Sequence, residues 1–443
     1  MMIDKNEGIL PGCDLKEEDC KEFKVICRRE VTHYYVTLKN KGGRCPHRGS
    51  YVTKVKELKE RILLHDEGVL IHYKARRLLC CCGKTFQEED PFAAGRRKIT
   101  SCLRKKILLF LKRYNHTFLE TAQRYGLSVT EVTEIFDTHV QIKRKPLRRV
   151  ISIDEFYFSR KSSRKYAFMI LGLNGEILDI LRSRKKYDLL NYFARLPSEE
   201  REKVLFVTMD MNAVYKEVIE RRLPNACICI DSFHVLTYIQ QCLDEVHLKV
   251  LNRYNGNRRS DEYYLLKSKR YVLFREDLKE EAQYNHHFRF PMSDIDYLSR
   301  ILKIDKELTE AYRLAKRYYY FNHYWQETGK KGALSFLERY IDDCILSGIP
   351  SFEKAARTLQ NWKEEIANSF IPYSTRNGEI IRLSNGRIEG KNSYIKKMIR
   401  LANGYSNFER FRNRVMYCEN LHDSYSEDEL PNTIRRKRKK DRK

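Results

Sequence analysis

The sequence has few acidic residues relative to basic ones, and it has no long apolar run. No stretch approaches the ~20 apolar residues that a membrane-spanning helix needs. The first residues also lack the basic start and apolar run of a signal peptide. We therefore expect a soluble, cytoplasmic protein without a membrane partner.

The cysteines do not indicate the disulfide framework of a secreted protein. The chain has 13 cysteines, an odd number, in a sequence without a secretion signal. This combination is typical of reduced thiols and leaves room for a metal site.

The charge balance is strongly positive. The 443 residues include 86 Lys and Arg against 60 Asp and Glu, for a formal net charge of +26. Such a chain attracts polyanions through steering and counterion release, and its 29 tyrosines offer stacking surface for bases. The sequence therefore favours a nucleic acid as partner, although a basic protein without one would show the same balance.

The region from 148 to about 235 alternates apolar runs with amphipathic ones. Strands are expected over 150–158, 165–173, 176–181, 204–209 and 226–230, with helices starting at Leu189 and over 214–222. Asn174-Gly175 is a strong signal for a hairpin turn. The resulting order, β-β-β-α-β-α-β, is that of an RNase H-like domain with a mixed five-stranded sheet, in which the first and fourth strands are neighbours.

Two acidic residues belong to those two neighbouring strands. Asp154 interrupts the apolar strand VISIDEFYF, where a carboxylate is costly to bury unless it is paired or bound to a metal. Asp210 ends the strand VLFVTMD. Carboxylates gathered in this way suit divalent cations and phosphoryl transfer. The alternatives are a solvent-facing Asp154 and an Asp210 that only caps a helix.

Asp231 and His234 follow the last expected strand. An Asp and a His three residues apart on a helix share one face. We interpret them as supporting residues that orient the site, while a structural histidine is the alternative for His234.

A helix-turn-helix pattern precedes the sheet. Ala122, Leu127, Val129 and Val132 are spaced as two short helices around Gly126. The second helix would begin near Ser128 and read a DNA groove, although many helical hairpins look similar. The residues expected to contact DNA here are Ser128, Thr130, Glu131, Lys143, Arg144, Lys145, Arg148 and Arg149.

Clustered cysteines near the start indicate an imperfect zinc motif. Cys45 and His47 form one half, and Cys80 and Cys82 form the other. A strong site would show CxxC in both halves, so an intact site and a lost one are both compatible with this spacing.

Several long stretches resemble one family. They are CPHRGS, RRLLCCCGKTF, ISIDEF, VTMDMNAVY, LPNACICIDSFHV, LKSKRYVLF and SNGRIEGKNSYIKKMIRLANGYSNFERFRNRV. Together they resemble the ISL-three family of bacterial insertion-sequence transposases over almost the whole chain. The one clear departure is Arg48, which stands where the family's zinc finger has a cysteine.

The resemblance implies a DDE transposase whose catalytic triad is Asp154, Asp210 and Glu389. Glu389 lies far downstream on an expected helix and is selected by the SNGRIEGKN match; without it, a surface glutamate is the alternative. The triad would hold two Mg²⁺ or Mn²⁺ ions, and Zn²⁺ would belong to the N-terminal motif. Basic and amide groups near Glu389 would face phosphates: Lys391, Asn392, Lys396 and Lys397.

The expected fold is an α+β multidomain protein. Its segments are a zinc-finger-like domain (1–95), a helix-turn-helix domain (97–147), the first part of the RNase H-like core (148–235), a helical insertion (236–380), the C-terminal helical part of the core (381–425) and a basic disordered tail (426–443).

The expected partners are double-stranded DNA, as element ends and as target, and further copies of the chain, because two ends must be joined. A bacterial protein associated with the nucleoid is implied. Two rivals stay open: a structure-specific nuclease or resolvase on the same fold, and a catalytically silent DNA-binding derivative.

Overall fold

The computed structural model describes residues 15, 17–93, 98–159 and 165–420. These residues form two compact units. The first contains the described residues up to Lys143 and those from Lys397 on, and the second runs from Arg144 to Lys396. The tail expected over 426–443 lies outside the described residues. Among the described residues, no helix has the length and apolar character needed to cross a bilayer.

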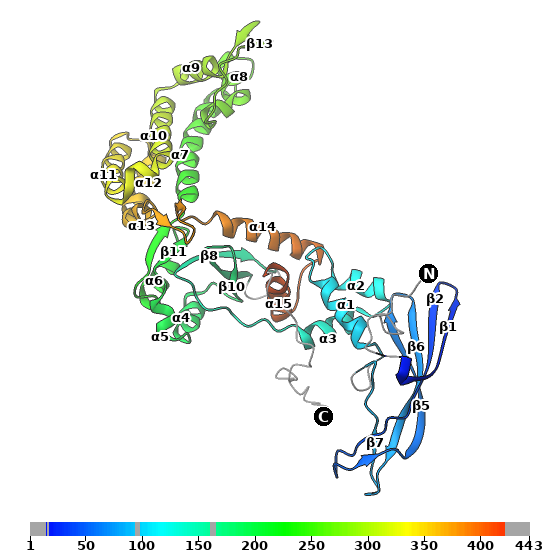
Figure 1. Ribbon diagram of the computed structural model, residues 1–443. Helices are drawn as coiled ribbons and strands as arrows, with labels where there is room; N and C mark the ends of the chain where they lie inside the picture. The colour runs from blue at the N-terminus through cyan, green and yellow to red at the C-terminus, as the bar shows by residue number, and fades with distance from the viewer. Residues whose placement is uncertain (1–14, 16, 94–97, 160–164, 421–443) are drawn as a thin grey trace, which may run out of the picture. The chain divides into compact units, whose positions relative to one another are not determined.

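A five-stranded sheet forms much of the first unit (Figure 1). Its strand order is β1-β2-β6-β5, and β7 pairs with the far part of β6. Alternation of side chains places Val36, Ile71 and Tyr73 on one face, where they form a small core. The strands of this unit are β1 (Cys20–Arg28), β2 (Val31–Leu38), β3 (Gly43–Arg44), β4 (Tyr51–Val52), β5 (Val55–Asp66), β6 (Val69–Leu79) and β7 (Thr85–Gln87), after the short helix η1 (Glu17–Asp19).

Three helices follow this sheet, and a fourth joins them from the end of the chain. They are α1 (Ser101–Leu111), α2 (Phe118–Tyr125), α3 (Val129–His139) and α15 (Phe408–Glu419). Gly126 ends α2 in the left-handed conformation, with φ 62° and ψ 35°, and Ser128 caps α3 in a capping box with Glu131. The helix pair around Gly126 is therefore present where the sequence predicted it.

The second unit is built on another five-stranded sheet. Its order is β10-β9-β8-β11-β12, with antiparallel pairing up to β8 and parallel pairing from β8 to β12. Its strands and helices are β8 (Val150–Tyr157), β9 (Tyr166–Gly172), β10 (Ile177–Leu181), α4 (Lys186–Ala194), α5 (Ser198–Glu202), β11 (Phe206–Met209), α6 (Ala213–Arg222) and β12 (Cys227–Ile230). The predicted neighbours β8 and β11 do pair directly.

The two faces of this sheet have different characters. Ile151, Ile153 and Val207 point toward α4 and α6, in the large apolar core of the unit. Positions of the opposite parity, Ser152 and Thr208, point to the other face. The polar side chains of Ser152 and Thr208 therefore lie on the face opposite the α4–α6 core.

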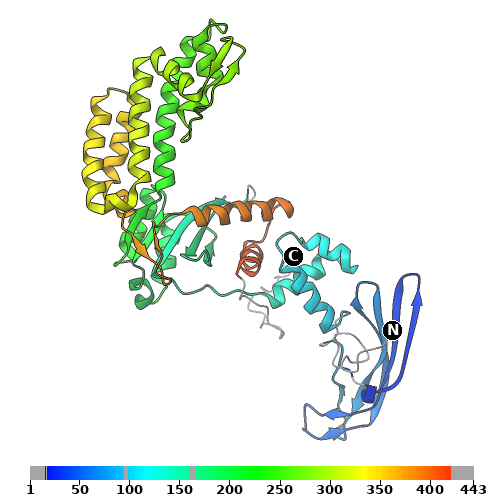
Figure 2. The same cartoon turned by 45° about the horizontal axis from the view of Figure 1, so that its top comes forward.

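A long helical segment separates the sheet from α14 (Gly386–Leu401). In Figures 1 and 2, α7 and α10 lie side by side in this segment, and their contacts agree with the view. Two short hairpins occur in this segment, where the sequence predicted helices. The elements are α7 (Ser232–Arg253), α8 (Asp261–Ser268), η2 (Arg270–Leu273), β13 (Gln283–Asn285), β14 (Phe290–Met292), α9 (Asp294–Ile304), α10 (Lys306–His323), α11 (Trp325–Leu346), α12 (Pro350–Asn361), α13 (Lys363–Asn368), β15 (Tyr373–Ser374) and β16 (Ile380–Ile381).

Candidate active site

Strand register brings Asp154 and Asp210 together on the polar face of the second sheet. Thr208 of β11 is paired with Ser152 of β8, and their hydroxyl oxygens are 2.6 Å apart. Each aspartate lies two residues further along its own strand direction, on the same face. The two carboxylates therefore come from neighbouring positions, one within β8 and the other directly after β11.

A third acidic group stands at the end of the next strand. Asp231 directly follows β12 and is 1% exposed. The carboxyl ends of neighbouring parallel strands form one edge of a sheet, which is where α/β proteins build their sites. Asp154, Asp210 and Asp231 therefore share one edge.

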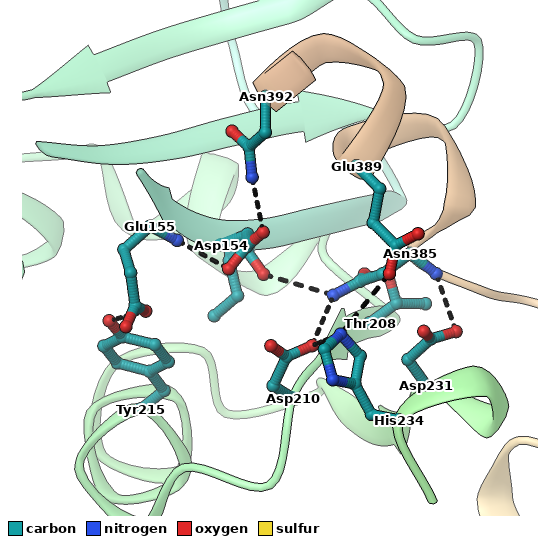
Figure 3. A network of polar contacts seen from close by, with 11 residues as sticks. Asp154, Glu155, Thr208, Asp210, Tyr215, Asp231, His234, Asn385, Glu389 and Asn392 are labelled. Carbon is teal, nitrogen blue, oxygen red and sulfur yellow. Dashed lines mark hydrogen bonds and ion pairs between the residues drawn. The ribbon is translucent and has the colours of Figure 1, made fainter. Parts of the chain in front are cut away.

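Glu389 reaches this edge from the first turn of α14 (Figure 3). Its Oε1 lies 3.4 Å from Nε2 of His234, and the same nitrogen lies 3.0 Å from Oδ1 of Asp210. The donor atoms of Asp231, His234 and Glu389 all lie within 4.8 Å of one another. The structure thus brings Glu389 beside the aspartates, and the group of ligand atoms within 4.8 Å of one another contains Asp231 and His234 but neither Asp154 nor Asp210.

Asn385, just before α14, connects the separate parts of this site. Its side-chain NH₂ lies 3.4 Å from Oδ1 of Asp210, and its backbone N–H donates to Oδ1 of Asp231 at 3.0 Å. Its Oδ1 lies 2.6 Å from the Thr208 hydroxyl. Asn385 is 1% exposed. The start of the helix that carries Glu389 is therefore fixed on β11 and on the segment after β12.

Asn392, one turn beyond Glu389, holds the remaining aspartate. Its Nδ2 donates to Oδ2 of Asp154 at 2.6 Å, while the Glu155 backbone N–H donates to Oδ1 of Asp154 at 2.7 Å. Both oxygens of Asp154 therefore accept a hydrogen bond. The carboxylate is oriented from two sides.

Burial and crowding of negative charge raise several pKa values here. Burial, followed by the charge of Asp210, raises the pKa of Asp154 to about 7. Burial also raises the pKa of Asp231 and that of Glu389. The hydrogen bond to Asp210 raises the pKa of His234 to about 9. At neutral pH His234 is thus a cation between two carboxylates.

The donor set fits a hard divalent cation. Carboxylate and amide oxygens are the ligands that Mg²⁺ takes in proteins. Two buried oxygens at this edge, Oδ2 of Asp231 and Oδ1 of Asn392, have no hydrogen-bond partner in the described part of the chain. Cations would compensate both the crowded carboxylates and these oxygens.

Glu155, next to Asp154, takes no part in this cluster. Its carboxylate accepts a hydrogen bond from Tyr215 and pairs with Arg184. This agrees with the period of two along β8, which directs Glu155 to the opposite face.

The first unit holds a second group of candidate ligands. The Sγ atoms of Cys45, Cys80 and Cys82 lie within 4.8 Å of one another, and those of Cys45 and Cys82 are 3.8 Å apart. Sulfurs of a tetrahedral zinc site with bonds of ~2.3 Å lie about 3.8 Å apart. Hydrogen bonds from the Cys82 backbone and the Ser50 hydroxyl lower the pKa of Cys80 to about 6, which favours the metal-binding thiolate.

His47, predicted as a zinc ligand, is exposed and lies outside this thiol group. The structure therefore brings three of the four predicted ligands together. Arg48 places its Nη1 3.9 Å from Sγ of Cys81, so a side chain at position 48 reaches the neighbourhood of the cluster.

Some of the side chains predicted to contact DNA form ion pairs within the protein, and others are exposed. Three of them form ion pairs inside the second unit: Arg144 with Glu200 at 2.6 Å, Lys145 with Glu176 at 3.1 Å and Arg148 with Glu176 at 2.9 Å. Lys143, Arg149, Thr130, Lys396 and Lys397 are exposed, and Lys391 is partly exposed. Glu131 is engaged in the α3 cap, where it accepts hydrogen bonds from Ser128.

Three residues of this site were not predicted from the sequence: Asn385, Thr208 and Ser152. Thr208 and Ser152 lie two residues before the predicted aspartates on the same strands, and period-two alternation was the signal that could have found them. Asn385 has partners from β8, β11 and the segment after β12, so only the folded chain reveals its role.

Comparison with known proteins gives a consistent result. A family model described as a transposase, of the DDE type and the ISL-three group, matches residues 151–415, more than half of the chain. The transposase for insertion sequence element IS1001 of Bordetella parapertussis is 22% identical over 380 residues, which cover 84% of this chain and 85% of the relative. The transposase for insertion sequence element IS1557 of Mycobacterium tuberculosis is 25% identical over 291 residues, 61% of this chain and 60% of the relative.

Proposed function

The chain belongs to the ISL-three family of insertion-sequence transposases, and we propose that it binds the terminal inverted repeats of an element, cleaves the DNA there and joins the ends to target DNA. The observation that carries this proposal is the gathering of Asp154, Asp210 and Glu389 at one sheet edge, with Asp231, His234, Asn385 and Asn392 around them (Figure 3). The second sheet, in which β9 alone runs antiparallel to the other four strands, supports an RNase H-like core.

In this proposal, Asp154, Asp210 and Glu389 hold two Mg²⁺ or Mn²⁺ ions. When bound, such ions lower the pKa of an attacking water or hydroxyl and stabilise the leaving oxygen of a phosphodiester. Asn392 orients Asp154, and Asn385 holds Asp210 and Asp231 at fixed positions. His234 keeps Asp210 and Glu389 close together. The residues thus contribute mainly positioning and charge stabilisation.

We propose that DNA recognition belongs to the first unit. The two helices around Gly126 and the capped start of α3 support a helix-turn-helix with α3 as the groove reader. Lys143 and Lys397 supply exposed charges for phosphates in this unit. Arg149 and Lys396 supply further exposed charges in the second unit. Zn²⁺ on Cys45, Cys80 and Cys82 would brace the N-terminal sheet. Because two ends must be joined, we expect at least a dimer on DNA.

Strand cleavage and strand transfer with labelled element ends test the assignment. Asp154→Ala, Asp210→Ala and Glu389→Ala should each abolish cleavage and leave end binding largely intact. Asp342→Ala is the matched control, because Asp342 is an exposed aspartate of α11 in the same unit. Cleavage at the wild-type rate by the Asp210→Ala protein would refute the triad.

The same assay separates the two rival functions. Cleavage that depends on DNA shape and is never followed by joining would indicate a nuclease or resolvase. End binding by the wild-type protein without cleavage in Mg²⁺ or Mn²⁺ would indicate a silent DNA-binding derivative.

A further inference from the structure

The N-terminal sheet is strongly polarised in charge. Residues 39–61 and 74–87, which we call the basic arm, contain twelve Lys and Arg but only two Glu. The rest of the first 95 residues contains six Lys and Arg against thirteen Asp and Glu. The arm consists of β3, β4, β7, the first part of β5 and the second part of β6. Its basic residues are Lys39, Lys41, Arg44, Arg48, Lys54, Lys56, Lys59, Arg61, Lys74, Arg76, Arg77 and Lys84.

Most of these charges face solvent and have no acidic partner. Ten of the twelve side chains are exposed, and only Arg61 and Arg76 are partly buried. The eight that form no ion pair within the described parts of the chain are Lys39, Arg44, Arg48, Lys54, Lys56, Lys59, Lys74 and Lys84. A run of exposed charges of one sign repels itself, so it is stabilised when a polyanion binds.

The β5 stretch of the arm is exposed on both faces. β5 is an edge strand of the sheet, and each residue from Val55 to Glu60 is exposed, whichever face it points to. Val55 to Arg61 pairs in antiparallel fashion with the second part of β6. The β5 part of this ribbon therefore faces solvent on both sides, whereas Leu78 and Phe86 beside it pack against Cys45 and Val52 from the segment of β3 and β4.

A groove of about 680 Å³ runs along this ribbon between β5, β6 and β7. Five cations line it: Lys59, Arg61, Arg76, Arg77 and Lys98. Three of them form ion pairs: Arg61 pairs with Asp90, Arg76 with Glu88, and Arg77 with Glu57 at 3.9 Å. The groove thus combines fixed guanidinium groups with free lysines, which suits a row of phosphates.

We infer that the basic arm is a second DNA-binding element, separate from the helix pair α2 and α3, and that it binds along the duplex of the element end. The inference rests on the proposed function. A two-stranded β ribbon fits the major groove of B-DNA, and the seven residues from Val55 to Arg61 extend for about 23 Å, roughly seven base pairs. DNA repels the acidic remainder of the domain and attracts the basic arm, so the uneven charge distribution turns the arm toward the DNA.

Salt-dependent binding tests the arm directly. The variant carries Lys54→Ala, Lys56→Ala and Lys59→Ala. The matched control carries Lys21→Ala, Lys24→Ala and Arg28→Ala, three exposed cations of β1 in the same sheet that form no ion pair with any described residue. Both proteins lose three positive charges, so a difference between them reports position. The probes are a duplex with the terminal inverted repeat and a random-sequence duplex of equal length.

Each phosphate contact contributes about 0.9 to the slope of log K against log salt concentration. For the arm variant we expect the magnitude of this slope to fall by about 2 to 3 on both probes. The control should keep the wild-type slope. A hydroxyl-radical footprint on the element end should shorten at one side only. Circular dichroism and thermal melting serve to check that both variants fold.

Different results would refute the proposed function and the arm assignment. If the wild-type protein has no preference for the element end over the random duplex, the proposed function and the arm assignment both fall. If the preference exists but the arm variant keeps the wild-type slope and footprint, the arm assignment alone is overturned.

Discussion

The carboxylate cluster and the thiol cluster bring candidate metal ligands together in opposite ways. The carboxylates come from β8, the end of β11, the segment after β12 and α14, which are distant in sequence and are joined by the hydrogen bonds of Asn385 and Asn392. The thiols come from two short segments at one end of a sheet, with Ser50 as a near neighbour.

The surroundings of the two clusters differ as well. The carboxylate edge adjoins the large apolar core of the second unit, which holds the strands in register without any metal. The thiols belong to a small cluster of Cys45, Val52, Leu78 and Cys80 with Phe86 against it. A small core gains much of its stability from a bound metal. The fold therefore positions the carboxylates without a metal, whereas the thiol cluster would stabilise its small core if zinc were bound.

Removal of divalent cations should produce the largest difference between the clusters. Chelation with EDTA should abolish strand cleavage, because the crowded carboxylates then lack the charge that stabilises the leaving oxygen. Mg²⁺ alone should restore cleavage, whereas Zn²⁺ alone should restore only the stability of the N-terminal sheet. Cleavage assays and thermal melts after each addition measure the two effects. Cleavage that persists in EDTA would contradict this separation.

The hydrogen-bond network of the carboxylate site should be the next most sensitive feature. Asn385→Ala should reduce cleavage by about 10- to 100-fold and weaken Mn²⁺ binding, as removal of residues that orient metal ligands does. Titration calorimetry with Mn²⁺ reports the binding separately from folding.

Asn368→Ala is the control for Asn385→Ala. Asn368 is also a buried asparagine of the second unit, and it donates to the Ile228 carbonyl at 2.8 Å, away from the carboxylates. Equal losses of Mn²⁺ affinity in both variants would mean that Asn385 acts only through general packing.

The thiol cluster should affect stability more than chemistry. Cys80→Ser should remove the bound zinc and lower the melting temperature of the protein by roughly 2–4 °C for each kcal/mol lost, while cleavage per folded molecule stays near the wild-type value. Cys102→Ser, a change at a cysteine of α1 outside the cluster, should leave both unchanged. Zinc content by atomic absorption checks the result. A Cys80→Ser protein with full zinc content would exclude this ligand set.

The smallest expected effect concerns the missing fourth ligand. Arg48→Cys would add a thiol close to Cys81 and the cluster. We expect zinc affinity to rise about tenfold, or by about 1.4 kcal/mol, as measured by competition with a chelator. Unchanged affinity would indicate that another group completes the coordination.

Much of the second unit was predictable because its signals are local. Apolar runs marked all five strands, and Asn174-Gly175 marked the hairpin turn, where Gly175 has φ 82°. The neighbouring positions of β8 and β11 followed from strand order, and the aspartates followed from strand register. The hairpins β13–β14 and β15–β16 were missed, because strands of two or three residues with mixed polarity give no clear period.

The sequence by itself determined the strands, Asp154 within one of them, Asp210 directly after another and the capped helix pair around Gly126, because periodicity and turn chemistry act over a few residues. Spacing and the family resemblance also selected Asp231, His234, Glu389 and Asn392, but only the tertiary structure revealed Asn385, Thr208 and Ser152 at the site. It brought Asn385 and Glu389 to the aspartates across the helical segment, and it left His47 outside the thiols. Such contacts depend on the packing of segments far apart in sequence, for which no local pattern exists.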